Sequence, residues 1–141
     1  MSSKAKQRVV FTNGCFDIVH VGHLHLLSEA KKLGDILIVA LNADNSVNKI
    51  KTSDRPIMPE LDRAYVLSCL ESVDYVILFH EETPEKVICK ILPDILVKGD
   101  DYKGKKIAGE ECLVKNGKKV KLLNIIEGKS TTSIINKILK S

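Results

Sequence analysis

One strand–turn–helix unit near the N-terminus, residues 12–23, reads Thr12-Asn13-Gly14-Cys15-Phe16-Asp17-Ile18-Val19-His20-Val21-Gly22-His23. The β-branched and aromatic run before it, 8–12, is typical of a strand, and the apolar spacing over 21–33 is typical of a helix. A glycine turn after a strand lets backbone N–H groups approach a ligand, and a helix N-terminus favours anions. The unit therefore predicts an anion site where the strand meets the helix.

Strand-like and helix-like runs alternate along the rest of the chain. Further strands are predicted over 35–41, 75–79, 95–97 and 119–123, and further helices over 59–70, 84–92 and 130–139. The polar stretch 42–54 predicts a short helix followed by a mobile loop, and 99–117, with its four glycines, a loop or broken helix. This order predicts an α/β fold: a doubly wound, Rossmann-like parallel sheet of five strands with helices on both faces.

Three segments rich in polar residues or glycine follow predicted strands: 13–23, 42–51 and 98–102. In doubly wound sheets, ligands bind outside the carboxyl ends of the strands. We therefore expect these three segments to form a single site.

Length and composition are those of one domain. The chain has 141 residues, of which 44% are hydrophobic and 28% charged. We expect a disordered tail over 1–7 and a folded domain over 8–141. The longest purely apolar run, 36–41, is far shorter than the roughly 20 residues of a membrane-spanning helix. With no signal-peptide pattern at the N-terminus, we expect a cytoplasmic protein that does not bind membranes.

The net charge of +4 is unevenly distributed, because residues 98–141 hold 11 lysines against 5 acidic residues. A basic region suits partners that carry phosphate, although solvated surface lysines are an equal alternative for most of them. With six aromatic residues and no tryptophan, the chain lacks a stacking platform, so a nucleic-acid partner is not expected.

The four cysteines, Cys15, Cys69, Cys89 and Cys112, include no Cys-x-x-Cys pair. We therefore expect neither a zinc site nor a disulfide framework. Cys69 and Cys89 fall within apolar helical patterns and are predicted to pack as small hydrophobic side chains.

His20 and His23 lie three residues apart and share one helix face. Two imidazoles at a helix N-terminus can donate hydrogen bonds to phosphate oxygens, which is the favoured interpretation. A metal pair and incidental surface histidines are the alternatives, although no carboxylate lies at a zinc-site spacing, and we assign no metal site. His25 is expected to face away from the pair.

Two motifs carry a family resemblance. Gly14-Cys15-Phe16-Asp17 followed by His20-Val21-Gly22-His23 resembles the signature of the cytidylyltransferase-like nucleotidyltransferase superfamily. Residues 127–132, Glu-Gly-Lys-Ser-Thr-Thr, resemble its second signature, with Lys129 where the family usually has Ile. Ile125 stands where cytidylyltransferases place Arg, which argues against cytidine specificity.

Further motifs resemble the heptose 1-phosphate adenylyltransferases within this superfamily. They are Arg55-Pro56-Ile57-Met58-Pro59, Arg63, the run 92–102 and Ile107-Ala108-Gly109-Glu110, so the resemblance covers roughly 8–139. In many bacteria this activity is fused to a sugar kinase. A chain of 141 residues has no room for that kinase, so we expect the free-standing form.

The resemblance implies the following site residues. The catalytic donors would be His20, His23 and Lys51, with Lys49 as the alternative to Lys51. The nucleotide contacts would come from Thr12, Asn13, Gly14, Cys15, Phe16, Gly22, Lys98, Gly99, Asp100, Gly128, Ser130, Thr131 and Thr132, and the secondary candidates are Arg55, Arg63 and Tyr102. Both lysines can instead be read as solvated, Arg63 as an exposed helix arginine, and Asp17 as a helix cap, which we favour over a ligand.

The implied reaction joins ATP and a heptose 1-phosphate to give ADP-heptose and pyrophosphate, for lipopolysaccharide or another envelope glycan. Mg²⁺ would be carried by ATP, and a homodimer is expected from the superfamily. The alternatives are a glycerol-3-phosphate cytidylyltransferase, an FAD synthase-like enzyme and, in another class, a non-catalytic nucleotide-binding module.

Overall fold

The structure is a computed structural model that describes residues 6–52 and 54–141. The disordered tail predicted over 1–7 falls for the most part outside these residues.

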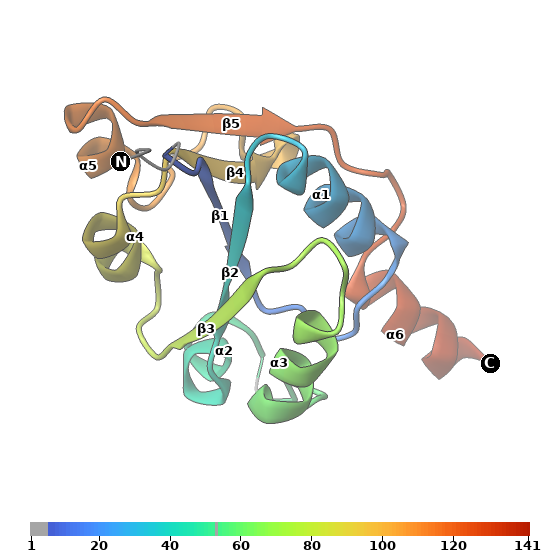
Figure 1. Ribbon diagram of the computed structural model, residues 1–141. Helices are drawn as coiled ribbons and strands as arrows, with labels where there is room; N and C mark the ends of the chain where they lie inside the picture. Colours follow the sequence, from blue (N-terminus) through green and yellow to red (C-terminus); the bar gives the residue numbers. More distant parts are fainter. Residues whose placement is uncertain (1–5, 53) are drawn as a thin grey trace.

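Five parallel strands form one sheet in the order β3-β2-β1-β4-β5 (Figure 1). The strands are β1 (Val9–Gly14), β2 (Ile36–Asn42), β3 (Tyr75–Phe79), β4 (Ile95–Gly99) and β5 (Lys119–Leu123). The helices are α1 (Val21–Lys31), α2 (Asp44–Ile50), α3 (Glu60–Ser68), α4 (Glu85–Ile91), α5 (Glu110–Lys115) and α6 (Thr131–Lys140), with a short 3₁₀ turn, η1 (Asp100–Tyr102). The predicted doubly wound α/β fold is confirmed.

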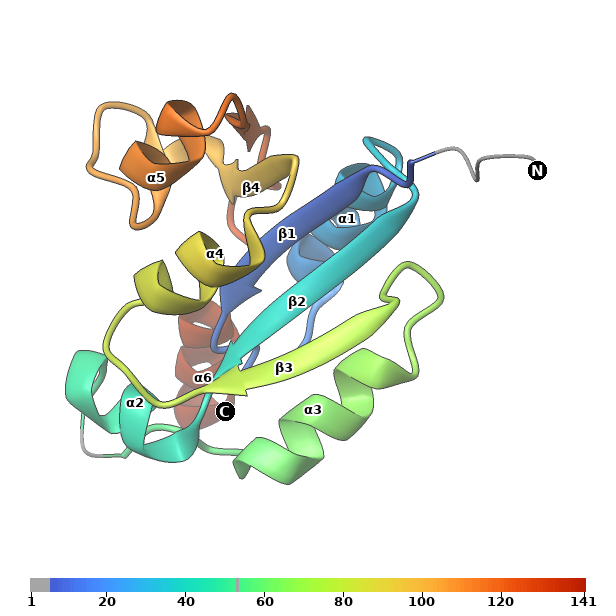
Figure 2. The ribbon, with the colours of Figure 1, turned by 60° about the vertical axis from the view of Figure 1, so that its left-hand side comes forward.

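Helices cover both faces of the sheet, and each face has its own apolar core (Figure 2). On one face, Leu27 of α1, Leu67 of α3 and Val10 of β1 belong to one cluster. On the other, Ile88 of α4 and Leu113 of α5 belong to a second cluster. Because successive strand residues point to opposite faces, the sequence of β1 supplies both cores.

Carboxylates hold the beginnings of the strands together. Asp35 accepts the Arg8 N–H, Asp74 the Leu37 N–H and Asp94 the Val9 N–H, at 2.7–2.8 Å. Lys31 and Lys118 pair with Asp74 and Asp94. These contacts lie at the edge of the sheet where the strands begin. The polar segments predicted to form a site follow the strands and therefore lie at the opposite edge.

Several element boundaries differ from the predictions. Pro84 precedes α4 as its N-cap instead of lying at the first helical position. The stretch 99–117, predicted to be a loop or broken helix, contains the short elements η1 and α5, which agrees with the prediction. The sequence offers Ser130 or Thr131 as the cap of the last helix, and the N-cap of α6 is Ser130.

The prediction for the cysteines was wrong in two respects. Cys89 of α4 and Cys112 of α5 form a disulfide, with their Cα atoms 5.8 Å apart. Cys69 is exposed at the end of α3. No spacing motif marks the bonded pair, because the two cysteines meet only when α4 and α5 pack on the same face of the sheet.

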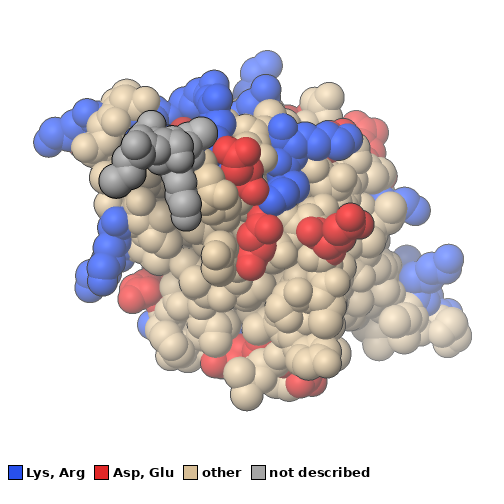
Figure 3. Space-filling view, viewed as in Figure 1, with Lys and Arg blue, Asp and Glu red and all other residues tan. Residues whose placement is uncertain are grey.

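The basic residues of the C-terminal third lie largely at the surface. Lys119 and Lys121 of β5 are exposed, and Figure 3 shows Lys and Arg side chains over the β5 edge and over α6. Within the described residues, no helix is long and apolar enough to cross a membrane.

Candidate active site

The two histidines are held by the backbone at the start of α1. His20 is the N-cap residue, and its Nδ1 accepts the Gly22 N–H at 3.1 Å. His23 Nδ1 accepts the His20 N–H at 3.2 Å. Because Nδ1 of each neutral ring is an acceptor, the ring proton lies on Nε2. Each ring therefore presents an N–H donor on the side away from the helix backbone.

Both imidazoles are neutral at pH 7. Burial, and then the neighbouring His20, lowers the pKa of His23 to about 4, and burial lowers the pKa of His20. The ring centroids of the pair are 3.9 Å apart, and those of Phe16 and His23 are 5.0 Å apart. The pair acts as a fixed set of uncharged hydrogen-bond donors.

Gly22 makes room for the His20 ring. A Cβ at this position would lie 2.8 Å from His20 Cε1 and 3.4 Å from the Cβ of Lys129. The glycine therefore lets the imidazole and the C-terminal signature approach the same turn of α1.

In the glycine turn after β1, the backbone of Phe16 is strained. Phe16 adopts a left-handed φ of +47° while its side chain is buried. A Cβ at Gly14 would lie 3.0 Å from the Phe16 ring. The Phe16 side chain thus belongs to the core and supports His23, which leaves its backbone as the part that a ligand can contact.

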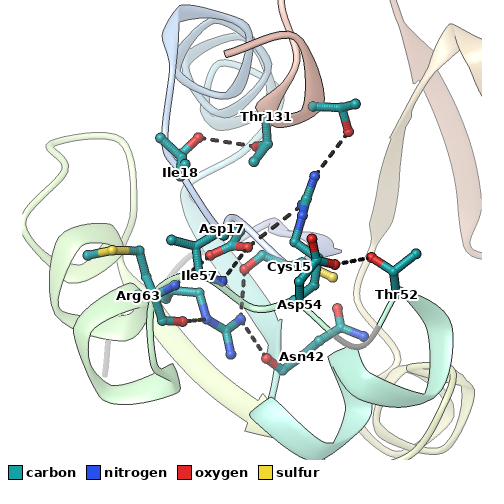
Figure 4. Close-up of polar contacts among 12 residues, drawn as sticks. Cys15, Asp17, Ile18, Asn42, Thr52, Asp54, Ile57, Arg63 and Thr131 are labelled. Atoms are coloured by element: carbon teal, nitrogen blue, oxygen red, sulfur yellow. Dashed lines mark hydrogen bonds and ion pairs between the residues drawn. The ribbon is translucent and has the colours of Figure 1, made fainter. Parts of the chain in front are cut away.

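Asp17 does not cap α1, contrary to the prediction. Its carboxylate accepts the Ile57 and Met58 N–H groups, both at 2.8 Å (Figure 4). Arg55 lies 3.7 Å from the same carboxylate. Asp17 therefore ties the segment before α3 to the first motif, a contact 40 residues away in sequence that local capping rules do not reveal.

Arg63 is not an exposed helix arginine, because only 1% of it is accessible. Its guanidinium donates to the carbonyl oxygens of Cys15, Asn42 and Met58 at 2.7–2.9 Å (Figure 4) and pairs with Asp44 at 2.7 Å. Arg63 thus links the end of β2 to the turn after β1 and is a positioning residue for that turn.

The two signature motifs touch. Thr131 Oγ1 donates to the Ile18 carbonyl at 3.3 Å, across 113 residues of sequence (Figure 4). Arg55 Nη2 donates to Thr132 Oγ1 at 3.1 Å. Gly128, with φ of +74°, forms the turn that precedes the Ser130 cap.

Lys51 and Lys49 differ in their surroundings. Lys51 follows α2 and is exposed. Burial raises the pKa of the Cys15 thiol, and the positive charge of Lys51 partly offsets this rise. Lys49 Nζ instead lies 3.5 Å from the His80 carbonyl oxygen. Of the two lysines, Lys51 is the one whose charge reaches the glycine turn.

The end of β4 supplies Lys98 and Gly99. Lys98 is 7% exposed, with Nζ 4.7 Å from the centroid of the Tyr102 ring. Burial lowers the pKa of Lys98 to about 8, and Asp101 partly offsets this. A Cβ at Gly99 would lie 2.6 Å from side-chain atoms of Asp101 and Ile125. Asp100 is exposed in η1.

A cavity of about 700 Å³ lies elsewhere, beneath residues 106–111 and beside α5. None of the predicted site residues lines it. The predicted residues from β1, β4 and the N-termini of α1 and α6 converge instead at the carboxyl edge of the sheet.

Comparison with known proteins agrees with the motifs. The family model described as cytidylyltransferase-like matches residues 11–137, nearly the whole chain. The chain belongs to the cytidylyltransferase-like family.

Curated relatives of this cytidylyltransferase-like chain include the bifunctional protein HldE of a Nitratiruptor species, which is 53% identical over 135 residues. HldE of Campylobacter concisus is 54% identical over 138 residues. The matches cover 96% and 98% of this chain but 28% of each relative, so the chain spans less than a third of their length.

A solved structure, the lipopolysaccharide core biosynthesis protein from Thermoplasma volcanium GSS1, is 36% identical with a TM-score of 0.70. That match covers 88% of this chain and all of the other. A pantoate-beta-alanine ligase from Francisella tularensis, 17% identical, has a TM-score of 0.55 over 96% of this chain and 72% of the other, and shares the fold. The predicted membership in a nucleotidyltransferase family is thereby confirmed.

Sequence reasoning did not find the structural importance of Asn42 and Asp44. Asn42 ends β2 and Asp44 begins α2, within the stretch predicted to bind a ligand, and Arg63 contacts the Asn42 carbonyl oxygen and the Asp44 carboxylate. Their only sequence signal is their place after a buried strand.

Proposed function

We propose that this chain is an adenylyltransferase that joins ATP and a heptose 1-phosphate, releasing pyrophosphate and forming ADP-heptose for an envelope glycan such as lipopolysaccharide. The observation that carries the proposal is the pair of Nε2–H donors at the N-terminus of α1, held by the backbone in a capping box. The names of the HldE relatives and of the lipopolysaccharide core biosynthesis protein favour this substrate class.

In the proposed reaction, an oxygen of the sugar phosphate attacks the α-phosphorus of ATP, and the bond to the pyrophosphate oxygen breaks. A phosphate monoester loses its second proton with a pKa of about 6, so the nucleophile is ionised at pH 7 without a general base. Catalysis then rests on positioning and on stabilising the charge that develops on the α-phosphate oxygens.

The residues of this chain would divide that work. His20 and His23 would donate to the α-phosphate, and Lys51 would neutralise charge on the triphosphate. The backbone of residues 12–16, with Gly22, would follow the phosphates, and Gly128 and residues 130–132 would complete the nucleotide cradle. Arg55, at the junction of the two signature motifs, would orient the cradle.

Mg²⁺ would be held by the β- and γ-phosphates, where it neutralises charge on the leaving group. The described residues contain no group of three His, Cys, Asp or Glu side chains placed to hold a metal ion, and Mg²⁺ commonly binds through substrate phosphates and water. We further propose that the enzyme acts in the cytoplasm as a homodimer.

The test is pyrophosphate release with Mg²⁺ and a panel of nucleotides and acceptors. We expect turnover of ATP with heptose 1-phosphate, and far slower turnover of CTP or of glycerol 3-phosphate. The choice of ATP rests on Ile125, which packs at Gly99 where cytidylyltransferases carry an arginine. A site built to hydrogen-bond one base leaves buried polar groups unpaired with another.

Each other outcome removes a defined part of the proposal. A preference for CTP of more than about tenfold, or 1.4 kcal/mol, would contradict the adenylyl assignment. Equal turnover of glycerol 3-phosphate would remove the heptose assignment. Binding of ATP without pyrophosphate release from any acceptor would favour a non-catalytic module.

A further inference from the structure

Strands β1 and β4 separate at their carboxyl ends. Their ladder pairs Val10 with Ile95 and Phe11 with Leu96. One residue further, the Thr12 hydroxyl donates to the Val97 carbonyl oxygen at 2.9 Å, so a side chain takes the place of a backbone donor. These strands also flank the point where the order of the sheet reverses, which is where doubly wound folds bind their ligands.

Asn13 and Lys98 lie just beyond this point, two residues after Phe11 and Leu96. Because side chains alternate along a strand, both lie on the face of Phe11 and Leu96, which α4 and α5 cover. Tyr102, whose ring lies under the Lys98 ammonium, packs against the same core cluster. The histidines belong to α1, which covers the opposite face.

Both side chains have unsatisfied polar atoms. Asn13 Oδ1 is buried without a hydrogen-bond partner, the one such side-chain atom among the described residues. Lys98 is nearly buried, and no described residue forms an ion pair or hydrogen bond with its ammonium, which lies over the face of Tyr102. The charge of Asp101 favours the charged ammonium but does not pair with it. A buried charge and a buried amide oxygen are normally paired, because each costs free energy when it is not. Two such groups on adjacent strands at a ligand-binding edge indicate that a ligand completes them.

The missing partner is an anion. The Lys98 ammonium has three N–H donors and no acceptor. One N–H can turn to Asn13 Oδ1 on the neighbouring strand while the others bind a phosphate. Asn13 is then a positioning residue for Lys98.

The anion is best assigned to the acceptor and not to ATP. The segments proposed to hold ATP meet on the α1 face, where Thr131 contacts Ile18 and Lys129 approaches Gly22. In phosphoryl transfer, the attacking and leaving oxygens lie roughly in line across the phosphorus. The attacking group therefore needs its own binding groups, across the α-phosphate from those that hold the leaving group.

We propose that Lys98, positioned by Asn13, binds the phosphate of the sugar 1-phosphate. This inference rests on the proposed function and gives Lys98 a role different from the nucleotide contact that the family resemblance implies.

The test separates the affinity for the acceptor from the affinity for ATP. Lys98→Met keeps the apolar stem in its buried place and removes the charge, and it should raise the KM for heptose 1-phosphate about 10- to 100-fold, the loss expected for a charged hydrogen bond. The Kd for MgATP, measured by calorimetry, should stay within about twofold. Lys105→Met is the matched control, since Lys105 is exposed and lies 5.8 Å from the centroid of the same Tyr102 ring.

Asn13→Asp is a second variant. Its carboxylate would pair with Lys98 and repel the incoming phosphate, so the KM for the acceptor should rise, and the melting temperature should rise with it because the ammonium gains a partner. Asn13→Asp with unchanged acceptor KM would overturn the role of Asn13. A merely structural role for Asn13 predicts lower stability without selective loss of the acceptor.

The failure of this inference can be told from failure of the proposed function. If the wild type releases no pyrophosphate with any sugar 1-phosphate, the proposed function is contradicted. The subsite has its own readout in the Kd for inorganic phosphate, which Lys98→Met should weaken and Lys105→Met should not. An unchanged phosphate Kd in Lys98→Met, or an equal loss of MgATP affinity, would overturn the inference.

Discussion

At the scale of single residues, His23 couples the stability of the fold to pH. Its pKa of about 4 in the folded protein lies below the value of about 6.5 expected for an unfolded chain. The unfolded state therefore binds the proton first as pH falls. The stabilisation is complete above about pH 6.5 and is lost progressively toward pH 4, since protonation of Nδ1 removes the acceptor of the His20 N–H.

We predict that the melting temperature of the wild type falls more steeply between pH 7 and pH 5 than that of His23→Asn. The asparagine carbonyl can still accept the His20 N–H but does not titrate. Thermal unfolding followed by circular dichroism at several pH values measures the difference. Parallel curves for the two proteins would show that His23 is not neutralised by burial.

Gly22→Ala should separate activity from stability. The new Cβ would press on the His20 ring at 2.8 Å and displace its Nε2 donor, while alanine favours the helix by about 1 kcal/mol over glycine. We predict that kcat falls by about 10²-fold, the cost of one misplaced donor, while the melting temperature is unchanged or higher. A Gly22→Ala variant with wild-type kcat would show that the position of the His20 ring does not matter.

At the scale of elements, α2 and the loop after it carry the candidate lysines. Lys51 is exposed and its charge reaches Cys15, whereas Lys49 lies against the His80 carbonyl. Val47 anchors α2 in the core, but Lys51, Thr52 and Asp54 after the helix are exposed. Exposed polar segments with little apolar packing open readily. Lys51 would gain a partner when the triphosphate binds.

We predict that hydrogen exchange of residues 45–54 slows when a non-hydrolysable ATP analogue is added. Lys51→Ala should lower the rate of pyrophosphate release, and Lys49→Ala, the matched control, should lower it much less. Unchanged exchange, or a wild-type rate in both variants, would mean that both lysines are solvated surface charges.

The elements themselves could be predicted from local sequence, since period-2 and period-3.6 patterns reflect burial on one or both faces. Strands β3 and β5 have the predicted bounds. The contacts of Asp17 with Ile57 and of Arg63 with Cys15 and the Cys89–Cys112 disulfide could not be predicted. Each joins residues more than 20 positions apart through backbone groups or packing that no short motif encodes. The same holds for Lys98 and Asn13, whose neighbourhood depends on the pairing of β1 with β4.

At the scale of the whole molecule, the sheet brings three distant segments to one edge. Carboxylates close the edge where the strands begin, and the carboxyl edge carries the histidines, Lys98 and the cap of α6. The donors of the histidine pair should contact the α-phosphate most strongly in the transition state, so their removal should lower kcat far more than it weakens ATP binding.

The most direct test of this account is the kcat for pyrophosphate release from ATP and heptose 1-phosphate by a variant that carries both His20→Ala and His23→Ala, with the Kd for MgATP measured alongside. Each donor typically contributes about 10²- to 10³-fold in rate, so we predict a loss of kcat of at least that size with little change in Kd. His25→Ala, on the same helix, is the control and should have the wild-type kcat. A double variant that keeps a near-normal kcat would contradict the assignment of this site.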